Sequence, residues 1–368
     1  MKNLRSGSLA KLWKTRRDSI ISFAMVLIAY PVIQAMINSG SISRAIKGQL
    51  VPICVYIVMA VSLNLTVGIL GELSLGHSGF MCVGAFSGVT TSILLTEAIP
   101  SEPLRLGISV VVAAAAAALT GVLVGLPVLR LRGDYLAIVT LAFCEIIKVL
   151  FQNFYLGVDE NGLHFDIIKK NFELSESGKL IIDGPSGIPS GAMSGQRIAT
   201  FGAGVLLVLF TLFVVLNLIN SRHGRAIMAV RDNKIAADSI GISTTRFRLL
   251  AFVLSASLAG MAGALYGASQ TVIEAKKYDF NLSILVLVFV VLGGLGNIWG
   301  SMLSATLLTL LPELLRGLNN YRMLIYAVLL ILMMLFNNSE LKITLGERLG
   351  GLKNRLTKKT AKAEGEVA

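Results

Sequence analysis

Glu145 and Lys148 are the ionisable residues most suited to a chemical role, because both lie within one long apolar run. Three positions apart on a helix, their side chains fall on one face and can pair. Ionisable groups inside a bilayer are costly and suggest a function, and a carboxylate there would suit a proton-coupled carrier. The other interpretation, which we favour, is a self-neutralising pair near the outer end of its span, whose long side chains reach the interface.

Motifs for other chemistry are missing from the sequence. It contains no Gly-x-x-x-x-Gly-Lys-Ser/Thr phosphate loop, so this chain is not expected to hydrolyse ATP. No Gly-x-Ser-x-Gly, His-Glu-x-x-His or Cys-x-x-Cys pattern supplies a nucleophile or a metal site. Cys54, Cys82 and Cys144 fall in apolar runs and are predicted to be buried side chains rather than ligands or disulfides. We therefore expect no catalytic residue, no metal and no cofactor on this chain.

Composition assigns the chain to the membrane. Of 368 residues, 54% are hydrophobic and only 15% are charged, which is more apolar surface than a soluble domain can bury. The net charge of +12 comes from basic residues between apolar runs and at both ends. That distribution fits flanks facing anionic lipid better than a nucleic-acid surface. The basic N-terminus runs through Arg17, and no cleavage site follows the next apolar run, so that run is predicted to be a span rather than a signal peptide.

The apolar runs predict an all-α integral membrane protein with about ten transmembrane helices. Residues 282–315 are too long for one span and contain a glycine-rich interruption, so we divide them in two. An even number of spans places the basic tails 1–18 and 338–368 both in the cytoplasm, as the positive-inside rule requires. The membrane part is then 19–337, with predicted spans at 19–37, 50–70, 79–97, 106–128, 135–152, 199–219, 249–271, 282–296, 299–315 and 321–336.

The longest segment between spans, 153–198, lies on the outer side in this topology. It carries four Lys or Arg and six Asp or Glu, and its Gly, Ser and Pro residues indicate turns. Because it is too long for a simple connection, we expect a contact surface for an extracytoplasmic partner, or a lid. The alternative is a variable insertion with no role.

Two glycine-rich segments, 68–79 and 293–300, interrupt the apolar pattern. Glycine frees the backbone from regular helix, and unwound backbone at membrane depth is tolerated only where protein buries it or where it lines a wet cavity. Each segment therefore either faces a transport pathway or forms a tight turn. The candidate pathway or gate residues are Asn64, Gly71, Ser74, Gly76, His77, Gly293 and Gly294, and Thr66, Ser255, Ser257 and Gln270 are polar neighbours of a type that more often hydrogen-bonds other helices.

The polar loop 220–248 separates two strongly apolar runs and is rich in Lys and Arg, which places it in the cytoplasm. Asp232 is predicted to cap a short helix, Gly241 to end it, and Ser243 to cap the next helix. Such a short helix can pass a push from a cytoplasmic partner to the membrane helices on either side. The alternative is an ordinary cytoplasmic loop with a solvated basic face.

The run Ile235-Ala236-Ala237, followed after three residues by Gly241, resembles the Glu-Ala-Ala-x-x-x-Gly signature of the permease subunits of bacterial ABC importers, with Ile235 in place of the Glu. In those proteins the loop docks on the ATP-hydrolysing subunit. The resemblance implies that the residues of this chain in contact with such a subunit are Arg231, Asp232, Asn233, Ile235, Ala236, Ala237, Asp238 and Gly241.

Further motifs, in family order, resemble the Liv-type branched-chain amino acid permeases, closest to their M-type subunit. The resemblance implies a permease subunit of the bacterial inner membrane that imports branched-chain amino acids, or related small neutral solutes, by alternating access. The motifs are GILGELSLGHSGF at 68–80, RGDYLAIVTLAFCEI at 132–146, AVRDNKIAADSIGI at 229–242 and GGLGNIWG at 293–300.

The same resemblance implies a set of partners. They are a homologous second permease subunit, two cytoplasmic ATPase subunits that carry the ATP and Mg, an extracytoplasmic substrate-binding protein and membrane lipid, with no nucleic acid. Two alternatives stay open. One is an ion-coupled secondary transporter of small neutral solutes that uses Glu145, and the other is a membrane scaffold subunit without a transport path.

Overall fold

A computed structural model describes residues 21–40, 43–131, 134–159, 162–167, 178–193, 195–196, 198–315 and the single positions 317, 321, 324, 325, 327, 328, 330 and 331. The chain divides into two compact units, Met1–Leu310 and Leu311–Ala368. The described residues of the second unit are mostly helical, and the fold that follows is that of the first. The predicted tails 1–18 and 338–368, and much of the predicted span 321–336, lie outside the described residues.

Helices make up most of the first unit. Every predicted span from 19–37 to 299–315 overlaps one of them. The helices are Ile21–Asn38, α2 Arg44–Asn64, α3 His77–Leu94, α4 Glu102–Val128, α5 Asp134–Gln152, α6 Phe201–Asn220, α7 Arg222–Asp232, α8 Lys234–Ser239, α9 Thr244–Gly267, α10 Phe280–Gly293 and α11 Ile298–Leu314. One π-helix, η1 Leu65–Leu70, continues α2, and two 3₁₀ turns are η2 Gly184–Ser186 and η3 Ala275–Lys277.

Six of the described helices are long and apolar enough to cross a membrane. One crossing takes about 20 apolar residues, and α10 and α11 are shorter, with 14 and 17. The 18 residues of α3 include Gly, Ser and Thr, which lower its hydropathy. The total of ten spans, with both termini cytoplasmic, stays a prediction. The six are Ile21–Asn38, Arg44–Leu70, Glu102–Val128, Tyr135–Gln152, Phe201–Asn220 and Thr244–Gly267.

The core of the bundle lies where α3, α4 and α9 pack together, because small residues let their backbones approach closely. A Cβ atom at Gly84 would lie 2.1 Å from Gly260 O, and one at Gly260 would lie 2.3 Å from the Cβ of Ala117. Small-residue contacts of this kind are a common way for membrane helices to pack. The helix Ile21–Asn38, in contrast, is mostly exposed within this chain, which leaves its apolar surface to lipid or to another protein.

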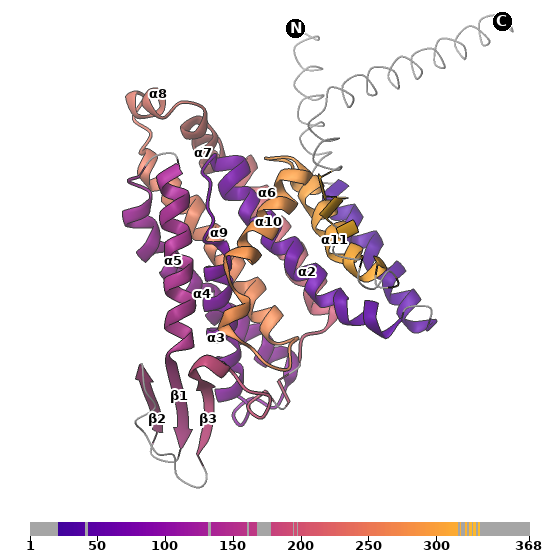
Figure 1. Cartoon of the computed structure of the whole chain (residues 1–368). Helices are drawn as coiled ribbons and strands as arrows, with labels where there is room; N and C mark the ends of the chain where they lie inside the picture. The colour runs from indigo at the N-terminus through magenta and orange to yellow at the C-terminus, as the bar shows by residue number, and fades with distance from the viewer. Residues whose placement is uncertain are drawn as a thin grey trace, which may run out of the picture. The chain divides into compact units, whose positions relative to one another are not determined.

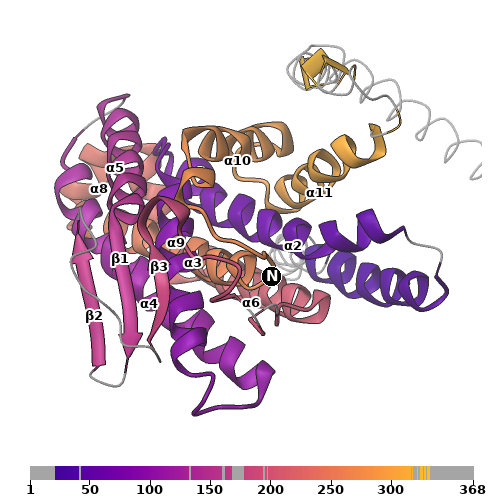
Figure 2. The ribbon, with the colours of Figure 1, turned by 60° about the horizontal axis from the view of Figure 1, so that its bottom comes forward.

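The prediction of an all-α chain is wrong for the segment 153–198, which contains β1 Phe154–Asp159, β2 Gly162–Ile167 and β3 Lys179–Asp183. The strands form one antiparallel sheet in the order β2-β1-β3. Figures 1 and 2 show the sheet at the end of α5, and Figure 1 shows α8 at the opposite end of this unit. Strands of five or six residues are easily missed in a sequence whose dominant signal is 20-residue apolar runs.

The segment that follows the sheet is tied to the helical bundle. Ile188 and Ile273 exchange two backbone hydrogen bonds, of 2.9 and 3.2 Å, and Ile273 lies in the loop after α9. Gly187 adopts φ +66°, and a Cβ atom there would lie 1.9 Å from Ile273 O. Only glycine fits this close approach, so the sheet segment is fixed on the bundle by its backbone.

Candidate functional site

Two short helices form the polar loop between α6 and α9. The side chain of Ser221 caps α7 by accepting a hydrogen bond from Gly224 N (3.1 Å), and Asn233 caps α8 by accepting from Ala236 N (3.0 Å). The predicted cap at Asp232 is therefore wrong. Asp232 ends α7, and its carboxylate accepts from the guanidinium of Arg231 instead. Asn233 has extended backbone (φ −156°), so α7 ends at Asp232. Asn233 rather than Asp232 therefore occupies the N-cap position of α8.

The end of α8 is a tight turn at Gly241, as predicted. Gly241 adopts φ +82°, a region in which glycine carries no steric penalty. Its N–H donates to Asp238 O (3.0 Å) and Ile242 N donates to Ala237 O (3.0 Å), the pair of bonds that closes a Schellman motif. Ser243 then occupies the predicted N-cap position of α9, but its side chain makes no capping hydrogen bond there.

Large apolar side chains flank α8 on its solvent side. Ile235 is 83% exposed and Ile240 is 74% exposed, although both lie in a polar, basic loop. Ile235 lies on α8 and Ile240 is its C-cap residue, so the two side chains lie at the two ends of one short helix. Of the eight residues predicted to contact an ATPase subunit, Ala237 alone is buried within this chain (3%), and the contact of all eight with such a subunit stays a prediction.

Arg231 connects this loop to the first glycine-rich segment. Its Nη1 donates to Gly68 O (3.1 Å). Gly71 ends η1 with φ +79°, and a Cβ atom there would lie 2.6 Å from Arg231 Cγ. Nearby, Ile227 of α7 is fully buried in a cluster with residues of η1. A π-helix often marks a functional site, and this one is packed directly against α7.

The two glycine-rich segments meet at Asn64. The Asn64 Nδ2 donates to Asn297 O (3.1 Å) and to Ser301 Oγ (2.9 Å), while its Oδ1 accepts from Gly296 N (2.8 Å). A Cβ atom at Gly68 would lie 2.3 Å from Gly296 N. Asn64 is fully buried, and it uses its amide to join the segments. Its predicted role in the pathway or gate stays a prediction.

Gly293 and Gly294 form the turn between α10 and α11. A Cβ atom at Gly293 would lie 2.3 Å from Ser301 N, and Gly294 adopts φ +93°. The glycines thus let the start of α11 fold back closely on the end of α10. A gating role for this turn also stays a prediction.

The remaining candidate pathway residues lie around the start of α3. The Nε2 of His77 and the hydroxyl of Ser62 share a hydrogen bond of 2.7 Å, and both side chains are buried. A Cβ atom at Gly76 would lie 2.3 Å from Thr140 O, so α5 passes close to this backbone. The hydroxyl of Ser74 is buried and has no hydrogen-bond partner among the described residues.

Polar side chains join α2 and the π-helix η1, which continues it, to α9. The hydroxyls of Thr66 and Ser255 share a hydrogen bond of 3.0 Å, and Ser255 also donates to Ser62 O (2.6 Å). These contacts match the interhelical role expected of such residues.

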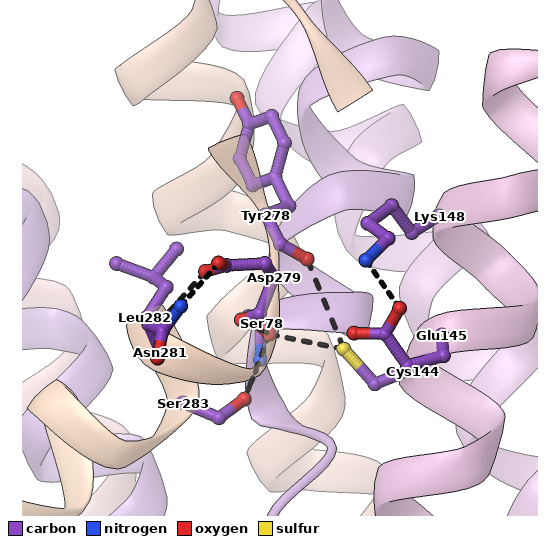
Figure 3. Close-up of polar contacts among 9 residues, drawn as sticks. All are labelled: Ser78, Cys144, Glu145, Lys148, Tyr278, Asp279, Asn281, Leu282 and Ser283. Carbon is purple, nitrogen blue, oxygen red and sulfur yellow. Dashed lines mark hydrogen bonds and ion pairs between the residues drawn. The ribbon is translucent and has the colours of Figure 1, made fainter. Parts of the chain in front are cut away.

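A second polar cluster, which the sequence did not reveal, lies where α3, α5 and α10 meet (Figure 3). The hydroxyl of Ser78 donates to Asp279 O (2.8 Å) and contacts the hydroxyl of Ser283 (2.7 Å) and the thiol of Cys144 (3.0 Å). Ser283 also accepts from Ser78 N (3.0 Å). Ser78 and Ser283 are 205 residues apart, so no local pattern could have paired them.

Glu145 and Lys148 form the expected ion pair on α5 (Figure 3). The side chain of Glu145 is 39% exposed and that of Lys148 is 18% exposed. A carboxylate already neutralised by a cation on its own helix fits the interpretation favoured from the sequence. Within the described ranges, no group of three or more His, Cys, Asp or Glu side chains is placed to hold a metal ion.

Arg248 and Glu72 form a buried ion pair that the sequence also did not reveal. Arg248 lies near the start of α9, and Glu72 lies in the first glycine-rich segment. A second nitrogen of Arg248, Nη1, donates to Leu129 O at the end of α4 (2.6 Å). The sequence shows only that each of these charged residues lies beside an apolar run. No local pattern could have paired them, because they are 176 residues apart.

Six described helices long and apolar enough to cross a membrane, joined by a polar, basic loop between α6 and α9, define a multi-pass membrane protein. The family described as Branched-chain amino acid transport system / permease component matches residues 45–336. The chain belongs to this family, which confirms the resemblance found in the sequence.

Individual relatives agree with the family match. The chain is 34% identical over 358 residues to the high-affinity branched-chain amino acid transport system permease protein LivM of Salmonella typhimurium (strain LT2), covering 95% of this chain and 78% of the relative. It is 35% identical over 326 residues to LivM of Escherichia coli (strain K12), covering 86% and 72%. The permease protein LivH of Escherichia coli (strain K12) is 34% identical over 113 residues, covering 30% and 36%. No solved structure matches the chain.

Proposed function

We propose that this chain is the M-type permease subunit of an ATP-driven importer for branched-chain amino acids or related small neutral solutes. The family and the LivM relatives support the solute class. The observation that carries the ATP-driven part is the exposure of Ile235 and Ile240 on α8. Exposed apolar side chains on a polar, basic loop can supply the apolar contact of a protein interface, and an ATPase subunit is the partner that the family signature implies.

In this proposal, ATP binding and hydrolysis in two cytoplasmic partner subunits move α8, and the bundle alternates between outward and inward openings. A partner can shift such an equilibrium only through contacts that differ between the two states. The caps at Asn233 and Gly241 make α8 a compact unit. Arg231 and the buried Ile227 join the preceding helix α7 to the first glycine-rich segment and η1. A displacement of α8 would therefore be transmitted through α7 to η1 and the first glycine-rich segment.

The other proposed partners are a second permease in the membrane and a binding protein at the sheet. A homologous second permease would pack on apolar faces left exposed here, as on Ile21–Asn38 and α4, and LivH is a candidate type by its similarity. An extracytoplasmic substrate-binding protein would meet the sheet, which lies opposite α8 (Figure 1). Phe165 and Ile167 of β2 are 68% and 54% exposed and supply apolar contact area. The complex would reside in the bacterial inner membrane.

The test is reconstitution of this chain with its ATPase, second permease and binding protein in liposomes. We expect uptake of labelled leucine that requires ATP inside and binding protein outside. The double variant Ile235→Glu, Ile240→Glu should lose both uptake and copurification of the ATPase, while the matched control Ile235→Leu, Ile240→Leu should keep them. Uptake by this chain alone, driven by an ion gradient, would contradict the proposal.

A further inference from the structure

Two cationic side chains contact the first glycine-rich segment from the side of the loop. Arg231 of α7 bonds to Gly68 O (3.1 Å), and Arg248 of α9 pairs with Glu72. Burial raises the pKa of the Glu72 carboxyl, while the charges of Arg248 and Lys234 oppose that rise. The segment is therefore joined to α7 and to α9 by one guanidinium group each.

We infer that Glu72 and Arg248 are positioning residues, which carry a displacement of α8 to the first glycine-rich segment and to the end of α4. The inference rests on the proposed function, because it assumes an ATPase that moves α8. One side chain joins three elements here. Arg248 lies on α9, its Nε donates to Glu72, and its Nη1 donates to the backbone oxygen of Leu129, the C-cap residue of α4.

The connection between α8 and Arg248 is short. Only residues 240–243 separate the end of α8 from the start of α9. The turn at Gly241 is closed by two hydrogen bonds back to α8, and these bonds restrict the backbone between α8 and α9. Arg248 follows within the first two turns of α9. A movement of α8 therefore displaces the guanidinium, and the guanidinium holds both Glu72 and Leu129.

Burial separates this pair from the exposed ion pair nearby. The side chains of Arg248 and Glu72 are 7% and 16% exposed, whereas those of Arg231 and Asp232 are 40% and 67% exposed. Exposed pairs contribute little because water and salt screen them. Loss of one partner from a buried pair leaves an uncompensated charge, so the contact between Glu72 and Arg248 has a strong effect on which arrangement is favoured.

One oxygen of Glu72 could make the contact between Glu72 and Arg248 differ in free energy between two arrangements of the bundle. The Oε2 atom is buried and has no hydrogen-bond partner among the described residues. A buried oxygen without a donor raises the free energy of the arrangement that contains it. A second arrangement in which Oε2 gains a donor would relieve that cost, which supplies the differential contact that a two-state mechanism needs.

The experiment uses the full complex in vesicles of phosphatidylethanolamine and phosphatidylglycerol. Leucine uptake and ATP hydrolysis are measured, the latter with and without leucine-loaded binding protein, and the melting temperature of each complex is recorded. The variants are Glu72→Gln, Arg248→Gln and the double variant. The control is Glu274→Gln, which neutralises one member of the exposed pair Lys277–Glu274.

We expect Glu72→Gln and Arg248→Gln each to keep the ATPase bound but to lower its stimulation by loaded binding protein about fivefold or more, the range of a typical coupling between sites. The double variant should be no worse than the poorer single variant, because each single variant already removes the contact between Glu72 and Arg248. Glu274→Gln should behave as wild type. Wild-type stimulation and uptake per assembled complex, with only a lower melting temperature, would assign the pair a purely structural role and overturn the inference.

Two further results complete the test. If Glu72→Gln does not assemble, Arg248→Lys decides, because it keeps the charge but loses the two-directional guanidinium. Reduced stimulation in Arg248→Lys supports the inference, and wild-type stimulation overturns it. A wild-type complex without ATP-dependent uptake would instead overturn the proposed function, and the inference with it.

Discussion

The end of the bundle that carries α8 and the end that carries the sheet are held together by different kinds of contact. At the α8 end, single side chains such as Arg231 and Arg248 bridge separate elements. At the sheet end, backbone ladders and the bridge between Ile188 and Ile273 do so. Side-chain contacts can rearrange one at a time, whereas a ladder moves as a block. We therefore expect motion at the α8 end and rigid docking at the sheet end.

The largest effect should come from filling the close approach at the start of α3. In Gly76→Ala the new Cβ would lie 2.3 Å from Thr140 O, and because the obstacle is backbone, helix α5 must shift. We expect a loss of about 3 kcal/mol of stability. The measurement is the melting temperature in detergent. The control is Gly107→Ala, where a Cβ meets nothing within 4 Å and alanine should stabilise the helix by up to ~1 kcal/mol. Equal melting temperatures for the two variants would contradict the packing described.

The next effect concerns the surface of α8 alone. Ile235→Glu should weaken the ATPase contact by about 2 kcal/mol, roughly 30-fold in affinity, as for a central interface residue. The melting temperature should stay unchanged, because Ile235 is 83% exposed. Ala237→Glu should instead destabilise the loop itself, because Ala237 is buried. Titration of purified ATPase onto the permease checks both, and similar affinities for Ile235→Glu and wild type would remove α8 from the interface.

The matching change at the other end should have a smaller and separate effect. The double variant Phe165→Ser, Ile167→Ser removes exposed apolar area from β2. The apparent affinity for binding protein should fall about tenfold, which corresponds to about 1.4 kcal/mol. Basal ATP hydrolysis and the affinity for the ATPase should stay unchanged. The readout is ATP hydrolysis across a range of binding-protein concentrations. A loss of ATPase affinity would show that the two ends are not independent, and an unchanged response would remove the sheet from the docking surface.

The smallest effect should come from Glu145, which takes part in neither set of contacts. Glu145→Gln breaks an ion pair within one helix, worth less than about 1 kcal/mol where it is solvated. We expect slightly lower expression and wild-type leucine uptake per folded molecule. Uptake that disappears in a fully folded variant would instead favour an ion-coupled carrier in which this carboxylate binds the coupling ion.

Local signals in the sequence predicted the features that depend on a few neighbouring residues. The apolar runs predicted the helices, Gly241 predicted the end of α8, and the spacing of Glu145 and Lys148 predicted their ion pair. The cap was misplaced by one residue because Asp232 and Asn233 are both good capping residues, and the choice depends on where the backbone becomes extended. The three strands were missed because each is short and amid much longer apolar runs.

Long-range contacts were beyond prediction from one sequence. Glu72 with Arg248, Asn64 with Gly296 and Ser78 with Ser283 are separated by 176, 232 and 205 residues. Which partner each side chain finds depends on how the helices pack, and small residues such as Gly84 and Gly260 set that packing through backbone distances rather than through any periodic pattern. The candidate site was therefore predicted as separate motifs, and the structure joins them into one connected region.

The most direct test of the central idea is photo-crosslinking from position 235 in native membranes. The native cysteines Cys54, Cys82 and Cys144 are buried, so a benzophenone maleimide should attach selectively to the thiol of Ile235→Cys. We expect labelling in inside-out vesicles but not in intact spheroplasts, and a light-dependent adduct with an ATPase subunit. Labelling from the outer side, or an attached label that yields no adduct with an ATPase, would contradict a cytoplasmic docking role for α8.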